Sequence, residues 1–331
     1  MIISKTPLRM SWVGGGSDLP SFYQDELGAV LSTSINKYVY IALNPKFDGN
    51  IRLNYSKTEE VSSVNDIEHP IFKQVLSFLD IKGGLEIASL ADIPSKGSGL
   101  GSSSSFTVGL LNALYAYKNQ YVSKDQLAKE ACEIEIIKCN EPIGKQDQYA
   151  AAYGGINLIK FYPNEAVSVE PIICSPNLHK EIEDHTLVFF TGRTRSASAL
   201  LAKQSKETVS LSKKLLLRRM VELSFELKAE LESNSIKNFG QILHENWALK
   251  TQLTNGISDI QIDSWYKEGL KNGATGGKLL GAGNGGFIMF FAPPEKHNKI
   301  INALSNLQKV DFKLESGGAQ IVFYQPYNNQ I

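Results

Sequence analysis

The sequence lacks the features that mark several large classes of protein. Its 34 lysine and arginine residues equal its 34 aspartate and glutamate residues, so no net field attracts nucleic acid or an anionic membrane. No window reaches about 18 consecutive apolar residues, and the first residues lack the long apolar region of an export signal. We therefore expect a cytoplasmic protein that binds a small molecule and has no nucleic-acid or membrane partner.

Cysteine is scarce as well. Cys132, Cys139 and Cys174 are odd in number and form no CxxC pair. This favours ordinary thiols in a reducing compartment over a disulfide framework. A chain of 331 residues is long enough for two subdomains.

Two common nucleotide-binding signatures are absent. The glycine-rich run at 94–105, PSKGSGLGSSSS, is neither GxxxxGK[ST] nor a GxGxxG motif with an acidic residue ending the next strand. The run nevertheless lies between a strand-like stretch at 85–90 and an apolar helical stretch at 106–117, which disfavours a flexible linker. A glycine loop that opens a helix leaves backbone N–H groups free at the positive end of the helix dipole, so it predicts a phosphate site.

Apolar periodicity predicts a strand-rich first half and a helical segment after it. Strands are expected at 8–13, 35–43, 51–55, 85–90, 156–161 and 186–190, with helices at 69–79, 103–117, 124–138 and 148–153. Residues 196–271 read as helical almost throughout, followed by strands at 286–292, 310–314 and 319–324 around a helix at 295–307. The change of character near Arg195 predicts domains at 1–195 and 196–331.

Two further glycine clusters are WVGGGSD at 12–18 and KLLGAGNGGF at 278–287. Glycine where a chain leaves a strand permits a positive φ and a close approach of the backbone to a ligand. Taken singly, each cluster is equally consistent with a tight turn.

Taken in order, PLRxSWVGGGSD, PxxxxGLGSSSS and KLLGAGNGGF resemble motifs one, two and three of the GHMP kinase superfamily, named for galacto-, homoserine, mevalonate and phosphomevalonate kinases. The resemblance spans nearly the whole chain. It implies an α+β fold with a ribosomal-protein-like N-terminal domain, a ferredoxin-like C-terminal domain and an active site between them. It also implies ATP and Mg²⁺ as cofactors.

The resemblance implies a role for individual residues of the nucleotide site. The residues expected to bind the triphosphate are Gly97, Ser98, Gly99, Leu100, Gly101, Ser102, Ser103, Ser104, Gly281 and Gly283. Ser103 and Glu135 match the metal-binding positions, although Glu133 or Glu141 remains an alternative ligand. Glu135 could instead be an exposed charge on an amphipathic helix.

The catalytic assignments also come from the resemblance. Asp147 matches the catalytic aspartate and Arg9 the arginine of the first motif. A helix-start aspartate is the alternative for Asp147. We interpret Lys278 as a solvated side chain outside the site.

The first motif bears on the acceptor. Galactokinase carries Glu and His before the aspartate, where this chain has glycine, so galactose is disfavoured. The residues predicted to contact the sugar are Gly15, Gly16, Ser17 and Asp18. The motifs together most resemble the bacterial D-glycero-D-manno-heptose 7-phosphate kinases, which phosphorylate the anomeric hydroxyl on the route to GDP-heptose for surface polysaccharide.

A sugar-phosphate acceptor needs a cationic site. Gly192, Arg193 and Arg195 in the segment TGRTRSAS are the predicted phosphate clamp, and a helix start with solvated arginines is the alternative. Weaker candidates are Lys5, Lys145 and Lys203. A free-sugar kinase, such as one for L-fucose, and a non-catalytic sensor of the same fold stay open, as does a homo-oligomer.

Overall fold

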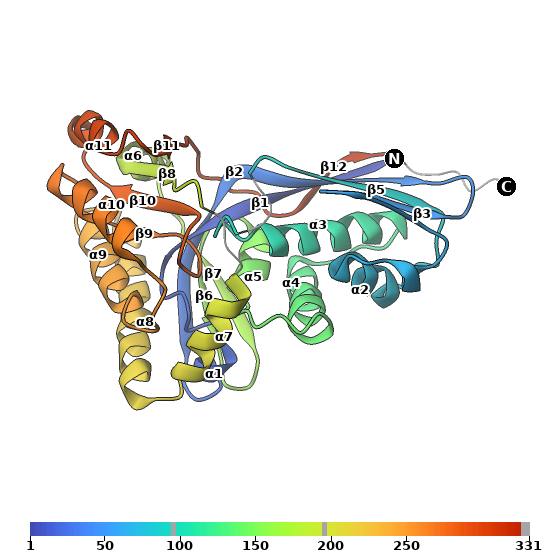
Figure 1. Cartoon of the computed structure of the whole chain (residues 1–331), viewed down its shortest axis with the longest axis horizontal. Coiled ribbons are helices and arrows are strands. Elements are labelled where there is room, and N and C mark those ends of the chain that lie inside the picture. Colours follow the sequence, from blue (N-terminus) through green and yellow to red (C-terminus); the bar gives the residue numbers. More distant parts are fainter. Residues whose placement is uncertain (94–96, 194–196, 326–331) are drawn as a thin grey trace.

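The computed structural model describes residues 1–93, 97–193 and 197–325. Two sheets, each with its own helices, lie beside one another along the long axis of the molecule (Figure 1). The mixed α+β architecture predicted from the sequence is therefore confirmed. Within the described residues, no helix combines the length and apolar character that a bilayer crossing requires.

The larger sheet is built around two long strands. Its strands are β1 (Ile2–Val13), β2 (Gly28–Pro45), β3 (Ile51–Asn54), β4 (Thr58–Val61), β5 (Leu85–Ala91), β6 (Ile156–Phe161), β7 (Val167–Pro171) and β12 (Gln320–Tyr324). The main path runs β12-β1-β2-β5-β3-β4, with β6 pairing β2 and β7, and only β3 and β5 are parallel among the described strands. The strand predicted at 35–43 is the second half of β2, and β4 and β7 were missed.

Helices cover one face of this sheet (Figure 1). They are η1 (Val64–Asp66), α2 (Pro70–Phe78), α3 (Ser102–Tyr117), α4 (Lys124–Cys132), η2 (Glu133–Lys138) and α5 (Gln146–Tyr153), while the short helix α1 (Pro20–Tyr23) between β1 and β2 lies apart from them. The helix predicted over 124–138 starts as expected, because the Ser123 side chain caps the N–H of Gln126. It ends differently, since its last six residues form a π-helical turn.

The smaller sheet has the order β11-β8-β10-β9 and is antiparallel throughout. Its strands are β8 (Thr186–Phe190), β9 (Gly276–Leu279), β10 (Phe287–Phe291) and β11 (Gln308–Lys309). The helices from residue 176 onward are α6 (Pro176–His185), α7 (Ala197–Glu207), α8 (Leu211–Glu232), α9 (Phe239–Lys250), α10 (Ile260–Lys271), η3 (Pro294–Lys296) and α11 (His297–Ala303). Helix α9 packs against β9, whereas α8 packs between α9 and β2 of the larger sheet. The strand predicted at 310–314 is wrong, because this segment makes only an isolated bridge between Leu314 and Ile35. The helix predicted at 295–307 is shorter, and α6 and β9 were missed.

Each sheet contains a strand from the other side of the predicted domain boundary. Strand β8 precedes residue 195 and belongs to the smaller sheet, whereas β12 follows it and pairs with β1 in the larger sheet, with Tyr324 opposite Ile2. The domain boundary near Arg195 therefore stays a prediction. A single cut in the chain does not separate the two sheets.

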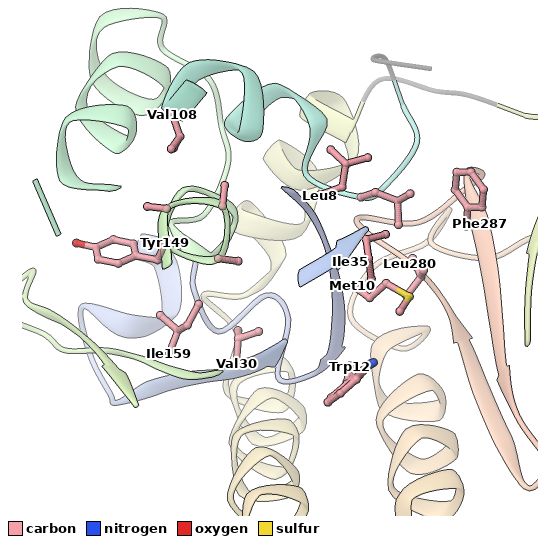
Figure 2. Close-up of a cluster of buried hydrophobic side chains, with 14 of the residues drawn as sticks. Leu8, Met10, Trp12, Val30, Ile35, Val108, Tyr149, Ile159, Leu280 and Phe287 are labelled. Atoms are coloured by element: carbon pink, nitrogen blue, oxygen red, sulfur yellow. The ribbon is translucent and has the colours of Figure 1, made fainter. Parts of the chain in front are cut away.

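One buried hydrophobic core joins the two sheets and their helices. The Trp12 ring of β1 packs edge-on against Phe239 of α9 with centroids 5.0 Å apart, and Phe239 stacks on Phe291 of β10 at 4.4 Å. Figure 2 shows Met10 and Trp12 in the same buried cluster as Leu280. Burying each large apolar side chain contributes roughly 1.5–3 kcal/mol, so this contact holds the end of β1 firmly against the smaller sheet.

Candidate active site

A cleft of about 590 Å³ lies where the three glycine motifs meet. The lining includes Arg9, Ser11, Gly15, Gly16 and Asp18 from the first motif region, Gly97, Ser98, Gly99, Gly101, Ser102, Ser103 and Ser104 from the second, and Gly281 from the third. The tertiary structure thus brings segments more than half the chain apart into one site.

The loop before α3 has the geometry of an anion site. Gly97, Gly99 and Gly101 have φ values of +69°, +76° and +76°, which glycine adopts without steric cost. Gly101 is the N-cap of α3 and no side chain caps this helix start, so the first-turn N–H groups stay free for a ligand. Leu100 is buried and absent from the described lining, while its carbonyl accepts from the Arg9 N–H at 3.0 Å.

The third motif packs directly against this loop. A Cβ placed on Gly99 would lie 2.3 Å from the Leu280 carbonyl oxygen, and one on Gly281 would lie 2.5 Å from the Gly99 Cα. Only glycine allows the two backbones to approach this closely. Gly281 lines the cleft as predicted, whereas Gly283 lies against Ile257 and is not part of the described lining.

Arg9 joins Asp147 to the loop. Its Nε and Nη2 donate to the two carboxylate oxygens of Asp147 at 2.8 Å each, and its Nη1 donates to the Gly99 carbonyl at 2.7 Å. A bidentate pair of this kind fixes the carboxylate in position as well as balancing its charge. Asp147 lies in the first turn of α5 without capping it, so the helix-cap alternative does not describe its contacts.

Glu135 lies at the other side of the loop. Its Oε1 accepts from the Ser103 hydroxyl at 2.6 Å and its Oε2 from the Gln148 amide at 2.7 Å. Burial raises the pKa of Glu135 to about 7. The side chain is therefore not an exposed charge, and it sits in the π-helical turn η2, a feature that occurs frequently at functional sites.

The other two glutamates differ from Glu135. Glu133 is exposed and pairs with Lys138 at 3.2 Å. Glu141 lines the cleft but accepts from the Ser198 hydroxyl at 2.6 Å. Of the three, Glu135 is the carboxylate bonded to Ser103 of the loop.

Ser103 and Glu135 fit a magnesium ion. The ion favours oxygen ligands and typically takes one or two carboxylates, with water and substrate phosphates completing its shell. The described residues contain no group of three or more His, Cys, Asp or Glu side chains that could hold a metal without such help. This donor set fits an ion shared with a nucleotide.

The first motif forms a tight turn around a buried carboxylate. One oxygen of Asp18 accepts from the Gly16 N–H at 2.8 Å and the other from the Gln146 N–H at 3.4 Å, and burial raises the pKa of Asp18. Ser17 does not face the cleft, because its hydroxyl donates to the Gly14 carbonyl at 2.8 Å beneath the turn. Its predicted contact with the sugar is therefore not seen in this arrangement.

Two buried lysines hold the same turn, and sequence reasoning missed both. The Lys278 ammonium donates to the carbonyls of Ser11 at 2.7 Å and Trp12 at 3.1 Å, so the interpretation of Lys278 as solvated is wrong. Lys250 of α9 donates to the carbonyl of Gly15 at 3.0 Å and the side chain of Gln204 at 3.2 Å. Burial lowers the pKa of Lys278 well below its usual value and that of Lys250 to about 8.

The segment TGRTRSAS does not form the predicted clamp in its described part. Arg193 pairs with Asp259 at 2.7 Å, and neither it nor Gly192 is in the described lining of the cleft. Arg195 lies outside the described residues. An arginine already held by a carboxylate has less charge to offer a second anion, which disfavours Arg193 as the clamp.

The three weaker lysine candidates also lie outside the described lining. Lys5 sits over the Tyr38 ring at 4.2 Å and Lys145 over the Tyr23 ring at 4.6 Å. Lys203 donates to the Asn255 carbonyl at 3.2 Å.

Comparisons with known proteins agree with the three motifs. A family model described as GHMP kinases N terminal domain matches residues 70–155, and one described as GHMP kinases C terminal matches residues 227–309. The D-glycero-alpha-D-manno-heptose 7-phosphate kinase of Campylobacter jejuni is 32% identical over 320 residues, which cover 93% of this chain and 94% of that protein. The bifunctional fucokinase/GDP-fucose pyrophosphorylase of Arabidopsis thaliana is 28% identical over 93% of this chain and 31% of its own length.

The fold has solved counterparts. A crystal structure described as a D-glycero-D-manno-heptose 1-phosphate kinase from Bacteroides thetaiotaomicron matches with a TM-score of 0.82 and 25% identity, covering 99% of this chain and 100% of that one. A putative sugar kinase from Campylobacter jejuni matches with a TM-score of 0.77 and 30% identity over 97% of both chains.

Proposed function

Because the chain belongs to the GHMP kinase family and is a kinase, we propose that it transfers the terminal phosphoryl group of ATP to the anomeric hydroxyl of D-glycero-D-manno-heptose 7-phosphate. The product is the 1,7-bisphosphate, a precursor for GDP-heptose and surface polysaccharide made in the cytoplasm. The names of the relatives support a heptose phosphate acceptor, but one says 7-phosphate and the other 1-phosphate. The position of transfer therefore has to be read from the product.

The observation that carries the proposal is the contact of Arg9 with both Asp147 and the Gly99 carbonyl. One guanidinium thus sets the distance between a carboxylate and the loop that would hold the triphosphate. The Asp147 carboxylate also lies beside the start of α3, since a Cβ on Gly101 would be 3.5 Å from it. A hydroxyl bound at Asp147 would therefore face phosphates held by the loop, which is the arrangement that in-line transfer requires.

The residues of the cleft divide the work of phosphoryl transfer. Asp147 orients the anomeric hydroxyl and accepts its proton as the new O–P bond forms and the bond from the γ-phosphorus to the bridging oxygen breaks, releasing ADP, while Arg9 keeps the carboxylate in place. The N–H groups at the start of α3 hold the phosphate oxygens. Ser103 and Glu135 would hold Mg²⁺, which supplies charge neutralisation at the phosphates.

A free-sugar kinase is the second candidate, and one observation favours it. Arg193 is bound to Asp259 and does not line the cleft, so the described residues of TGRTRSAS provide no cation for an acceptor phosphate. A kinase for a free sugar needs no such cation. The fucokinase domain named in the plant relative is consistent with this alternative.

The test is ATP-dependent release of ADP with Mg²⁺, comparing D-glycero-D-manno-heptose 7-phosphate with L-fucose, galactose and mannose. Phosphorus NMR of the product gives the position of transfer. Turnover of the heptose phosphate to a 1,7-bisphosphate is the expected result. Turnover of a free sugar alone would mean that the acceptor is a free sugar and not heptose 7-phosphate. No turnover with any sugar would favour a non-catalytic sensor.

A further inference from the structure

We infer that Lys250 determines acceptor specificity by binding, together with Asp18, a pair of neighbouring hydroxyl groups in the uncharged part of the sugar. Ser11 and Gln146 flank this subsite. The inference rests on the proposed function, since it places the acceptor in the same cleft. It also assigns a residue from the C-terminal half of the chain that none of the three motifs contains.

Two unpartnered polar atoms mark the place. The hydroxyl of Ser11 and the side-chain carbonyl oxygen of Gln146 are buried without a hydrogen-bond partner among the described residues, although both residues line the cleft. They flank one turn, because a Cβ on Gly15 would lie 3.2 Å from the Ser11 Oγ and 3.6 Å from the Gln146 amide nitrogen. Leaving a buried polar atom unpaired costs about 1–3 kcal/mol, so these atoms indicate a polar ligand.

Lys250 has bonding capacity to spare. Its ammonium carries three donors, and two of them meet the Gly15 carbonyl and the Gln204 side chain. Among the described residues, no carboxylate lies within ion-pair distance of it. The residue is 5% exposed and lines the cleft, so a ligand bound there can accept from the third donor.

Asp18 supplies the complementary acceptor. Its carboxylate has about four lone-pair positions and receives two backbone N–H groups, from Gly16 and Gln146. Asp18 and Lys250 lie on the same residue of the turn, because Asp18 accepts from the Gly16 N–H at 2.8 Å and a Cβ on Gly16 would lie 3.3 Å from the Lys250 ammonium. Asp18 comes from the first motif and Lys250 from α9, which makes the subsite a junction between the two halves of the chain.

The pairing of charges favours a diol over a phosphate. An anion next to Lys250 would also meet the Asp18 carboxylate, and the repulsion would offset the attraction. A hydroxyl both accepts and donates, so one hydroxyl can accept from Lys250 while its neighbour donates to Asp18. An acceptor phosphate would therefore bind elsewhere, and this subsite would bind hydroxyl groups of the sugar ring.

The first experiment compares Lys250→Met with the wild type and with Lys118→Met. Lys118 is a matched control because its ammonium also donates to a backbone carbonyl, that of Leu79 at 2.9 Å, outside the cleft. Losing a hydrogen bond from a charged group raises the KM for the acceptor about 10- to 100-fold, with the KM for ATP unchanged. A Lys250→Met enzyme whose acceptor KM stays at the wild-type value would overturn the inference.

The second experiment removes the same hydrogen bond from the side of the substrate. Monodeoxy analogues of the sugar that is turned over are compared on the wild type and on Lys250→Met. At least one analogue should lose about 10- to 100-fold in kcat/KM with the wild type and little further with the variant, because both changes remove the same bond. Independent losses at every position contradict a bond between Lys250 and a hydroxyl.

Two further outcomes separate the inference from the proposed function. If Lys250→Met weakens binding of a sugar phosphate but not of the same sugar without phosphate, Lys250 binds the phosphate and the diol assignment is wrong. If no sugar is turned over, calorimetry with heptose 7-phosphate, mannose and L-fucose decides. Wild-type binding that Lys250→Met weakens upholds the inference, and equal binding, or none, overturns it.

Discussion

The two ends of the cleft differ in how their polar groups are satisfied. At the end that we propose for the nucleotide, Arg9 is paired with Asp147, and Glu135 accepts bonds at both of its oxygens. At the end that we propose for the acceptor, Ser11 and Gln146 keep unpartnered atoms. The carboxylates at the first end are therefore held by protein side chains, whereas polar atoms at the second end are left for a ligand.

The largest effect on this comparison is expected from Asp147→Asn, which removes the proposed catalytic carboxylate. The amide keeps the size of the carboxylate but cannot take the proton of the attacking hydroxyl, so kcat should fall about 10²- to 10⁴-fold. Steady-state kinetics measures the loss, and calorimetry with ATP checks that nucleotide binding is kept. A folded variant with wild-type kcat would remove Asp147 from the mechanism.

Glu135→Gln tests the metal assignment. Loss of a magnesium ligand should raise the Mg²⁺ concentration needed for half-maximal activity about 10- to 100-fold. Titration of activity with Mg²⁺ measures the shift. Glu133→Gln is the matched control, since Glu133 is exposed and paired with Lys138, and it should leave the Mg²⁺ requirement unchanged.

The raised pKa of Glu135 also predicts that the stability of the metal-free protein depends on pH, with Glu135→Gln as the reference. The pKa of Glu135 is raised by burial from its ordinary 4.5 to about 7, so between these values the folded state binds more protons than the unfolded state. The free energy of unfolding of the wild type should therefore fall relative to Glu135→Gln as pH rises from about 4.5 to 7, by about 3 kcal/mol in total. Urea unfolding with a chelator measures it, and a constant difference would contradict the burial argument.

Gly99→Ala tests the packing of the loop on the third motif. The added methyl would lie 2.3 Å from the Leu280 carbonyl oxygen, so we expect a loss of about 1–3 kcal/mol in stability and a higher KM for ATP. Gly49→Ala is the control, because Gly49 has a similar φ of +75° with no atom within 4 Å of the added position. Equal losses in the two variants would mean that φ strain, not the contact, is responsible.

The smallest effect is expected for Arg193→Ala. Its ion pair with Asp259 is partly exposed, so the stability should change by about 0–1 kcal/mol and the acceptor KM by less than about twofold. Kinetics with heptose 7-phosphate measures it. A large rise in KM for the phosphosugar, absent for a free sugar, would restore Arg193 as a phosphate clamp, and Arg195→Ala in the same assay tests the remaining prediction for that segment.

Motif matches gave candidate residues that the structure brings into one cleft. Ser103, Asp147 and most of the glycine loop line it, although Leu100 does not, and their roles stay predictions. Glu135 was assigned with two alternatives, and its bond to Ser103 now distinguishes it. The loop was predicted from its own residues because backbone conformation and helix starts depend on residues close in sequence, whereas the roles of Ser103, Glu135 and Asp147 came from the family resemblance.

The acceptor end could not be predicted in the same way. Lys250 lies in a run of helical residues whose spacing looks ordinary, and Lys278, the first residue of the third motif, reads as a surface lysine. Ser17 was predicted to contact the sugar, and Gly283 the triphosphate, by their place in a motif, yet neither is in the described lining of the cleft. Periodicity does not say which distant carbonyls a buried lysine will meet.

The sequence by itself determined the α+β character, predicted the phosphate loop and carried the three motifs that resemble the family. The first two depend on glycine conformation, helix dipoles and apolar spacing, which act over a few residues. Only the tertiary structure decided the return of β12 to the first sheet, the burial of Lys250 and Lys278, and the pairing of Arg193 with Asp259. Burial and charge pairing depend on segments far apart in the chain, and folding alone brings them into contact.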